Sequence, residues 1–310
     1  MRVLVTGGTG YLGAAIVRAL TSRGHHPVVF ARRATSAGLP GVLIDGDIRH
    51  LPAFRSAAEG ADAIIHVAAL VSIWRPQPVE FHDVNVGGLQ NALDVTHALG
   101  IRRLVYTSSF LALPPSDGNA PLDANDYQRT KRQARDVAVA AARAGTPIAI
   151  LYPGVVYGPG PLTEGNLVGR LLRDHLQGRL PGVVGADRYW SFTYVDDVAR
   201  AHVLAIESRD AQGEYTVGGE NAPQMRPYEI VKGIKGVRLP RRIPAAIAYV
   251  AGAVDEARAA VTKKPPRLTR GAVRISLHDW WLDSARSIRE LNYRITDLET
   301  GIRAVLASSS

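Results

Sequence analysis

Short apolar runs alternate with segments of helical periodicity through the first half of the chain. The apolar runs are Val3–Thr6, Val28–Ala31, Val42–Ile44, Ala63–Val67, Leu104–Thr107 and Ile148–Tyr152. The segments with apolar residues at helical spacing are Gly10–Arg23, Leu51–Ala58, Val79–Leu99 and Tyr127–Arg143. Strands that alternate with helices form βαβ units, and continuously apolar strands are covered on both faces. The pattern therefore predicts an α/β fold with a doubly wound parallel sheet.

The pattern becomes more broken after residue 155. Proline and glycine are concentrated in 153–161, ahead of a helix-like Asn166–Gln177 and a strand-then-helix pattern at Tyr194–Ile206. Such a change predicts a second structural unit. The expected sheet domain comprises residues 1–155 and about 190–210, and the expected smaller lobe comprises residues 156–190 and 210–310.

Composition excludes several kinds of protein. The 310 residues are 46% hydrophobic and include no cysteine, which rules out disulfides, iron–sulfur clusters and thiolate nucleophiles. The apolar runs Ala63–Trp74 and Ile243–Val254 have about 12 residues, whereas a membrane-spanning helix needs about 20. The N-terminus lacks a signal-peptide pattern, and the histidines lack metal-binding spacing. We expect a soluble cytoplasmic protein with no metal and no membrane partner.

The net charge of +9 does not by itself indicate a polyanionic partner. Of the 37 basic residues 32 are arginine, and they are scattered with no run longer than two. An arginine-rich composition explains this charge at least as well as a nucleic-acid surface does. No nucleic-acid partner is expected.

A glycine-rich turn connects the first strand to the first helix. Its sequence, Thr-Gly-Gly-Thr-Gly-Tyr-Leu-Gly over Thr6–Gly13, matches the fingerprint in which Gly7 makes a tight turn, Gly10 admits a pyrophosphate and Gly13 allows close helix–strand packing. The helix N-terminus stabilises the anion. The strand–turn–helix context favours dinucleotide binding over a turn without ligand. The residues expected to contact the cofactor here are Gly7, Thr9, Gly10, Tyr11, Leu12 and Gly13.

The end of the second strand bears on the choice of cofactor. An acidic residue there hydrogen-bonds the ribose of NAD, whereas arginine accommodates the 2′-phosphate of NADP. This chain has Arg32 and Arg33 and no acid, so NADP is favoured and NAD stays an alternative. A solvated basic loop is the simpler interpretation of these arginines. Asp47 and Ile48, after the third strand, are expected at the adenine edge.

Tyr127 and Lys131 are four residues apart on a predicted helix, so their side chains share one face. A neighbouring ammonium and an oxidised nicotinamide both favour phenolate, and they are expected to lower the pKa of the tyrosine from about 10 towards the working range. A second pair with the same spacing, Tyr228 and Lys232, follows no suitable strand and is expected on a helix surface.

Hydroxyl groups precede the tyrosine–lysine pair at the end of the fifth strand. Ser109 is the expected donor to the substrate oxygen, with Ser108 as the second choice. No Gly-x-Ser-x-Gly pattern surrounds them, which disfavours covalent hydrolase chemistry.

Taken together, these motifs resemble those of the extended short-chain dehydrogenases/reductases, over nearly the whole chain. The resemblance rests on Thr6–Gly13, Asp47-Ile48, His66–Ala69, Asn85–Gly87, Tyr106–Ser109, Tyr127–Lys131, Tyr152–Gly154, Tyr194–Ala199 and Val217–Glu220. It implies a Rossmann domain that binds NAD or NADP and a smaller substrate-binding lobe. It also implies that Ser109, Tyr127 and Lys131 carry catalysis and that Asn85 orders a helix and a proton-relay water. The further cofactor contacts implied are Ala68, Ala69, Thr107, Lys131, Tyr152, Pro153 and Val156.

Two branches of this family compete. Trp190 stands where sugar-nucleotide enzymes often carry a phosphate-binding arginine. Residues 280–302 resemble the dihydroflavonol 4-reductase and 3β-hydroxysteroid dehydrogenase branch, and they also resemble hopanoid-associated sugar epimerases. An NADP(H)-dependent oxidoreductase that interconverts a ketone and a secondary alcohol on an apolar or aromatic substrate is therefore expected. A nucleotide-sugar epimerase or dehydratase with tightly bound NAD is the alternative, and a non-catalytic cofactor sensor is the alternative of another class.

The expected partner is a small-molecule substrate. Its pocket is expected to be formed by Trp74, Ser108, Phe110, Gly154 and Trp190. Ser109 and Tyr127 are only 18 positions apart, so the loop 114–124 is expected to form a reduced lid over an open pocket. The resemblance suggests a homodimer through the predicted helices Val79–Leu99 and Tyr127–Arg143, and a monomer is equally compatible with the sequence.

Overall fold

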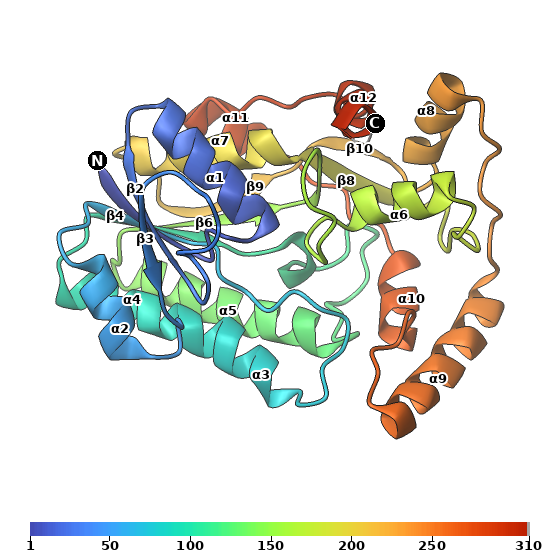
Figure 1. Ribbon diagram of the computed structural model, residues 1–310, viewed down its shortest axis with the longest axis horizontal. Helices are drawn as coiled ribbons and strands as arrows, with labels where there is room; N and C mark the ends of the chain where they lie inside the picture. The colour runs from blue at the N-terminus through green and yellow to red at the C-terminus, as the bar shows by residue number, and fades with distance from the viewer. Residues whose placement is uncertain (309–310) are drawn as a thin grey trace.

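A seven-stranded parallel sheet forms the centre of the molecule, as the computed structural model of residues 1–308 shows (Figure 1). Its strand order is β3-β2-β1-β4-β5-β6-β9, and every neighbouring pair is parallel. The strands are β1 (Arg2–Thr6), β2 (His26–Ala31), β3 (Val42–Asp45), β4 (Ala63–His66), β5 (Arg103–Thr107), β6 (Ile148–Pro153) and β9 (Gly213–Val217). The predicted doubly wound α/β fold is confirmed.

Helices cover both faces of this sheet (Figure 1). One layer contains α1 (Tyr11–Ser22), α7 (Val195–Glu207) and α11 (Ala285–Leu291), and their apolar residues share a core with the upper face of the sheet. The other layer contains α2 (Leu51–Ala58), α4 (Gly88–Ala98) and α5 (Asp126–Arg143). Two separate cores follow from this arrangement, which explains why the strand residues are apolar without alternation.

The segment expected to be one helix, Val79–Leu99, is interrupted. It consists of α3 (Val79–His82), a π-helical stretch Asp83–Gly87 and α4. A π-helical turn is wider than an α-helical one and is often found at functional sites. Here it carries the buried Asn85. Periodicity alone does not reveal such a turn, because the apolar spacing on both sides of it remains helical.

The smaller lobe is built on a second, three-stranded sheet of order β10-β8-β7. Its strands are β7 (Val155–Tyr157), β8 (Tyr189–Tyr194) and β10 (Glu220–Pro223). The lobe also contains α6 (Leu167–Leu176), α8 (Arg226–Lys235), α9 (Ala245–Thr262), α10 (Arg270–Ser276) and α12 (Leu298–Ser308). Among residues 1–308, no helix combines the length and the apolar character that crossing a bilayer would require.

The boundary between the two units differs from the expected one. Strand β9 lies within the segment assigned to the lobe, yet it pairs with β6 at the edge of the main sheet. Helix α11 packs on β9 from the same layer as α1. Conversely, β8 belongs to the small sheet although it falls within the segment expected in the larger domain. The chain thus returns to the main sheet after residue 210.

Tyr228 is not the surface residue that its neighbourhood predicted. It is buried in the core of the lobe, and its ring meets that of His175 edge-on with centroids 5.2 Å apart. Lys232 is exposed. The expectation was wrong because α8 packs against α6 and α12, so the tyrosine faces the core of the lobe while the lysine faces solvent.

Candidate active site

The glycine turn between β1 and α1 leaves no room for side chains. Gly7 has φ +68°, and a Cβ atom there would lie 2.7 Å from Cα of Ala68. A Cβ atom on Gly13 would lie 2.2 Å from the carbonyl oxygen of Gly7. Both contacts are too short for a real side chain, so the turn can close against α1 and β4 only with glycine at these positions.

The N-terminus of α1 fits an anionic group. Its N-cap is Gly10, no side chain caps it, and its first turn holds no acid. The first amide bonded within this helix is that of Ala14, so the amides of Tyr11, Leu12 and Gly13 stay available as donors. Backbone donors at a helix N-terminus suit a pyrophosphate. Thr9 is exposed on the same turn, whereas Tyr11 is buried.

At the other end of the expected cofactor groove, Arg32 and Arg33 are exposed in the turn after β2. Within residues 1–308 neither side chain has a hydrogen bond or ion pair with a protein group. Asp47 is bound by Arg49 at 2.6 Å, and this contact, with a smaller contribution from Arg32, lowers its pKa. Ile48 is buried against α4.

Lys131 lies inside the molecule at the end of β5. Only 2% of its surface is exposed, and its Nζ atom donates to the carbonyl oxygen of Thr107 at 2.8 Å and to the Tyr106 hydroxyl at 3.4 Å. Burial lowers the pKa of Lys131 to about 7. The neighbouring His66 is buried as well, and burial together with the charge of Lys131 lowers its pKa to about 3.

Tyr127 lies one helical turn before Lys131, next to Ser109. Burial raises the pKa of Tyr127, and a hydrogen bond with the Ser109 side chain partly offsets this. The expectation that Lys131 would lower this pKa is wrong for the protein alone. The Nζ atom of Lys131 donates to the Thr107 carbonyl instead. Burial lowers the pKa of Lys131, so the side chain is less often protonated at neutral pH. Tyr127 is therefore protonated at neutral pH.

Ser108 and Ser109 face different environments. Ser109 caps the short 3₁₀ helix Phe110–Ala112 by accepting from the amide of Leu111 at 3.2 Å. The Oγ atom of Ser108 is buried and has no hydrogen-bond partner among residues 1–308. A buried hydroxyl without a partner is costly, so this atom is a position where a ligand could supply one.

Asn85 joins three elements of the site. Its Oδ1 atom accepts from the amide of Leu70 at 2.8 Å, and its Nδ2 atom donates to Thr130 Oγ1 at 3.0 Å. The loop that follows β4, with Ala68 and Ala69, is thereby attached to α5 next to Tyr127. Asn85 orders the loop as well as the helix, which the sequence did not indicate.

Tyr152 and Gly154 do not occupy the places expected of them. The Tyr152 ring lies in the core between the main sheet and the layer of α2, α4 and α5, and its hydroxyl donates to Glu214 at 2.7 Å. Only the backbone of Tyr152 can therefore face the expected cofactor site. A Cβ atom on Gly154 would lie 2.4 Å from the carbonyl oxygen of Ser191, so β8 fills the space expected to be pocket. Pro153 ends β6, and Val156 packs against the core between the main sheet and the layer of α1, α7 and α11.

The expected aromatic pocket residues separate into two groups. Phe110 and Trp190 have ring centroids 6.2 Å apart and pack together with Trp280 in the core of the lobe. Trp74 instead lines a surface cavity of about 340 Å³ between the N-terminus of α5 and the segment of α9 and α10 that includes Glu256. The five predicted pocket residues therefore do not form one enclosed pocket.

The loop 114–124 is attached to the lobe rather than open. Ser116 donates from its amide to the carbonyl oxygen of Asp279 at 2.8 Å, and Asp117 pairs with His278 at 2.9 Å. The expectation of a reduced lid over an open pocket is wrong, because these contacts hold the loop against residues 278–281.

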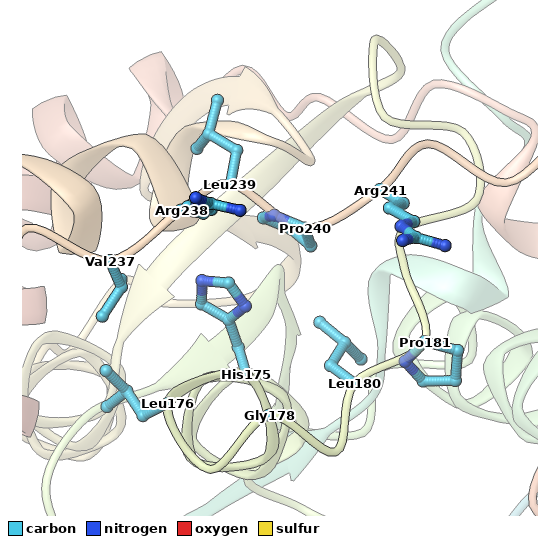
Figure 2. Close-up of a pocket in the computed structure, with 10 residues that line it drawn as sticks. All are labelled: His175, Leu176, Gly178, Leu180, Pro181, Val237, Arg238, Leu239, Pro240 and Arg241. Atoms are coloured by element: carbon cyan, nitrogen blue, oxygen red, sulfur yellow. The ribbon is translucent and has the colours of Figure 1, made fainter.

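Another surface cavity, of about 430 Å³, lies between α6 and Val237–Arg241 (Figure 2). The figure shows His175 reaching from α6 towards Pro240. None of the residues predicted for catalysis or cofactor binding lines it. The candidate active site is therefore the carboxyl edge of the main sheet, where α/β proteins bind their ligands.

Comparison with known proteins identifies the family. Residues 3–218 match the model of the NAD dependent epimerase/dehydratase family. The chain belongs to this family. It is 31% identical to sterol demethylase protein B of Methylococcus capsulatus, with 100% of this chain and 97% of the relative aligned. It is also 31% identical to a 2-alkyl-3-oxoalkanoate reductase of Stenotrophomonas maltophilia, with 100% of each chain covered.

The crystal structure of gox2253 has the same fold, with a TM-score of 0.82 and 28% identity over 99% of this chain and 97% of that one. The resemblance to extended short-chain dehydrogenases/reductases is thereby confirmed. The chain is an NAD(P)-dependent enzyme of this group.

One residue at the site was missed from the sequence. His202 in α7 is fully buried, and its Nε2 atom lies 2.7 Å from Thr107 Oγ1. His202 lies three residues after the motif Tyr194–Ala199, and this short distance in the sequence is the feature from which it could have been predicted.

Proposed function

We propose that this enzyme transfers hydride between NADP(H) and the carbon of a ketone or secondary alcohol, with Ser109, Tyr127 and Lys131 as the catalytic residues. The observation that carries the proposal is the placement of Lys131 at the carboxyl end of β5, bound to the Thr107 carbonyl at 2.8 Å, one helical turn from a tyrosine that its surroundings keep protonated. A protonated phenol can donate to a substrate oxygen as negative charge develops on it.

The residues of the chain divide the work. A bound reduced nicotinamide supplies the hydride. In the reducing direction Tyr127 gives its proton to the substrate oxygen, and Ser109 donates a hydrogen bond to the same oxygen. Lys131 is held at the end of β5 by Thr107, from where its ammonium can bind the ribose of the cofactor. Its pKa of about 7 allows it to assist reprotonation of Tyr127 at neutral pH.

The arginines after β2 support the preference for NADP. Both guanidinium groups are exposed and lack a protein partner within residues 1–308, so they are free to bind a 2′-phosphate. Asp45, at the end of the adjacent strand β3, accepts hydrogen bonds from the amide and the hydroxyl of Thr35 at 2.9 Å and 2.8 Å, so both of its oxygens already have a partner. Asp47, after the same strand, is paired with Arg49, so within residues 1–308 both carboxylates at this end of β3 already have partners and neither is free to select the ribose of NAD.

An apolar ketone is the proposed substrate class. Trp190 replaces the expected phosphate-binding cation, and it is buried among aromatic rings. Two relatives, named for a sterol and for an alkyl-substituted oxoalkanoate, point to the same chemistry. A nucleotide-sugar epimerase remains the second candidate because the family includes epimerases. A homodimer through α4 and α5 also remains a prediction.

Titration of the protein with NADPH and NADH, followed by turnover with a panel of aliphatic, aromatic and steroid ketones, tests the proposal. We expect tighter binding of NADPH and net oxidation of it by at least one apolar ketone. Copurified, tightly bound NAD with no net turnover would support the epimerase instead. Binding of neither cofactor would contradict both.

A further inference from the structure

Helix α9 has its apolar side turned away from the protein. Its four largest exposed aliphatic residues, Ile247, Val250, Val254 and Val261, are 61%, 66%, 65% and 83% exposed. Their spacing of three, four and seven residues aligns them along one face of the helix. Alanines at positions 246, 251, 257 and 260 flank this row and are exposed too. The gap of seven residues is filled by Arg258, which lies between Val254 and Val261 on the same face and pairs with Asp255 at 2.7 Å.

The side of α9 that faces the protein carries small residues and the two carboxylates of the helix. Its buried residues are the small Ala248, Gly252 and Ala259. Both carboxylates of the helix point inward: Asp255 accepts from the amide of Leu268 at 3.1 Å, and Glu256 accepts from that of Arg270 at 2.7 Å. A helix of a globular protein normally buries its apolar face, so this reversed orientation indicates that something else covers the row.

Positive charge is concentrated around the same helix. Residues 238–274 include nine basic residues and two acidic ones, which gives +7 of the net charge of +9 for the whole chain. The basic residues are Arg238, Arg241, Arg242, Arg258, Lys263, Lys264, Arg267, Arg270 and Arg274. Arg238 and Arg241 precede the helix, and Lys263 and Lys264 follow it, so the apolar row lies between two cationic ends.

We propose that α9 docks on an anionic lipid surface, with its axis parallel to the membrane and the row of Ile247, Val250, Val254 and Val261 inserted among the acyl chains. Apolar residues on one face with basic residues around them are typical of helices that lie in the membrane interface. The 18 residues of α9 span about 27 Å, which is enough for such contact. The expectation of no membrane partner considered only spanning helices.

Charge favours a lipid surface over a second copy of the chain. Two copies that packed along this row would bring two regions of net charge +7 together, which costs free energy. An anionic surface attracts the same region through each basic residue close to it. Figure 1 shows α9 at the periphery of the molecule, away from the main sheet, where a planar surface can reach it.

Cosedimentation with vesicles tests the proposal on the full-length protein. We expect binding to vesicles of equal parts phosphatidylglycerol and phosphatidylcholine, and little binding to phosphatidylcholine alone. The double variant Val250→Ser/Val254→Ser should partition about tenfold more weakly, because both side chains lose apolar contact. The charge variant Lys263→Gln/Lys264→Gln should lose affinity as well, and high salt should mimic it.

A matched control separates this row from exposed aliphatic residues in general. Ile288→Ser/Ile295→Ser changes two such residues, 48% and 40% exposed, outside the basic region, and should leave vesicle binding unchanged. Absence of vesicle binding, equal binding to neutral vesicles, or undiminished binding of the valine variant would each overturn the proposal. A dimer in light scattering that the valine variant dissociates would assign the row to a second copy and overturn it too.

Discussion

The Oγ1 atom of Thr107 lies 2.7 Å from the Nε2 atom of His202. The other ring nitrogen of His202 lies 2.8 Å from the carbonyl oxygen of Val198, so it carries the hydrogen and Nε2 accepts from the threonine. Burial lowers the pKa of His202 to about 4, which keeps the ring neutral at physiological pH. Because the carbonyl of the same Thr107 holds Lys131, α7 helps to fix the lysine in place.

Replacing His202 with phenylalanine should destabilise the protein. The Thr107 hydroxyl would lose its buried partner, at a cost of about 1–3 kcal/mol in the free energy of unfolding. Urea denaturation measures this cost. Thr107→Ala/His202→Phe should be less unstable than the sum of the two single variants, since they remove one interaction. Strict additivity would show that the two side chains are not coupled.

Replacing Tyr127 with phenylalanine should remove the proton donor and leave the cofactor site intact. We expect kcat to fall by about 10²–10⁴-fold, the usual contribution of a general acid. NADPH binding, followed by fluorescence, should stay within about twofold of the unmodified protein, since no backbone donor of α1 is altered. Turnover reduced by less than tenfold would remove Tyr127 from the mechanism.

Stability should depend on pH through Lys131. Its pKa falls from 10.5 to about 7 on folding, so above pH 7 the native state has released a proton that the unfolded chain still binds. The free energy of unfolding should therefore rise with pH in this range, by about 2 kcal/mol between pH 7 and 9, relative to a Lys131→Met variant measured in parallel. Parallel pH profiles for the two proteins would contradict the shift.

Arg32→Ala/Arg33→Ala should weaken NADPH binding by about tenfold or more, because each guanidinium forms charge-assisted hydrogen bonds to a phosphate. NADH binding should change little. The variant Arg303→Ala, on α12 and away from this edge, is the control for loss of surface charge. An equal loss for both cofactors would mean that the arginines support the fold of the turn rather than select the phosphate.

The strands and the glycine turn could be predicted because local sequence determines them. Runs such as Ile148–Tyr152 are apolar throughout, and a parallel strand covered on both faces requires this. Gly7 and Gly13 occupy positions where any side chain would collide with backbone, so the fingerprint is a steric requirement. The proximity of Ser109 to Tyr127 also followed from motif order.

Other features depend on tertiary contacts that no local pattern contains. The π-helical turn at Asn85 is held by Leu70 and Thr130, which are far apart in sequence. Strand β9 is only partly apolar because it lies at the sheet edge, so its sequence resembled that of the lobe. The direction of the pKa shift of Tyr127 depended on burial, which the spacing to Lys131 cannot reveal.

The return of the chain to the main sheet makes the two lobes inseparable by a single cut. A fragment that ended near residue 212 would retain every candidate catalytic residue, yet β6 would lose five paired residues along its edge. An exposed edge of this kind invites aggregation. Chimeras that exchange substrate lobes with relatives should therefore keep residues 213–217 with the host sheet and place the junction after them.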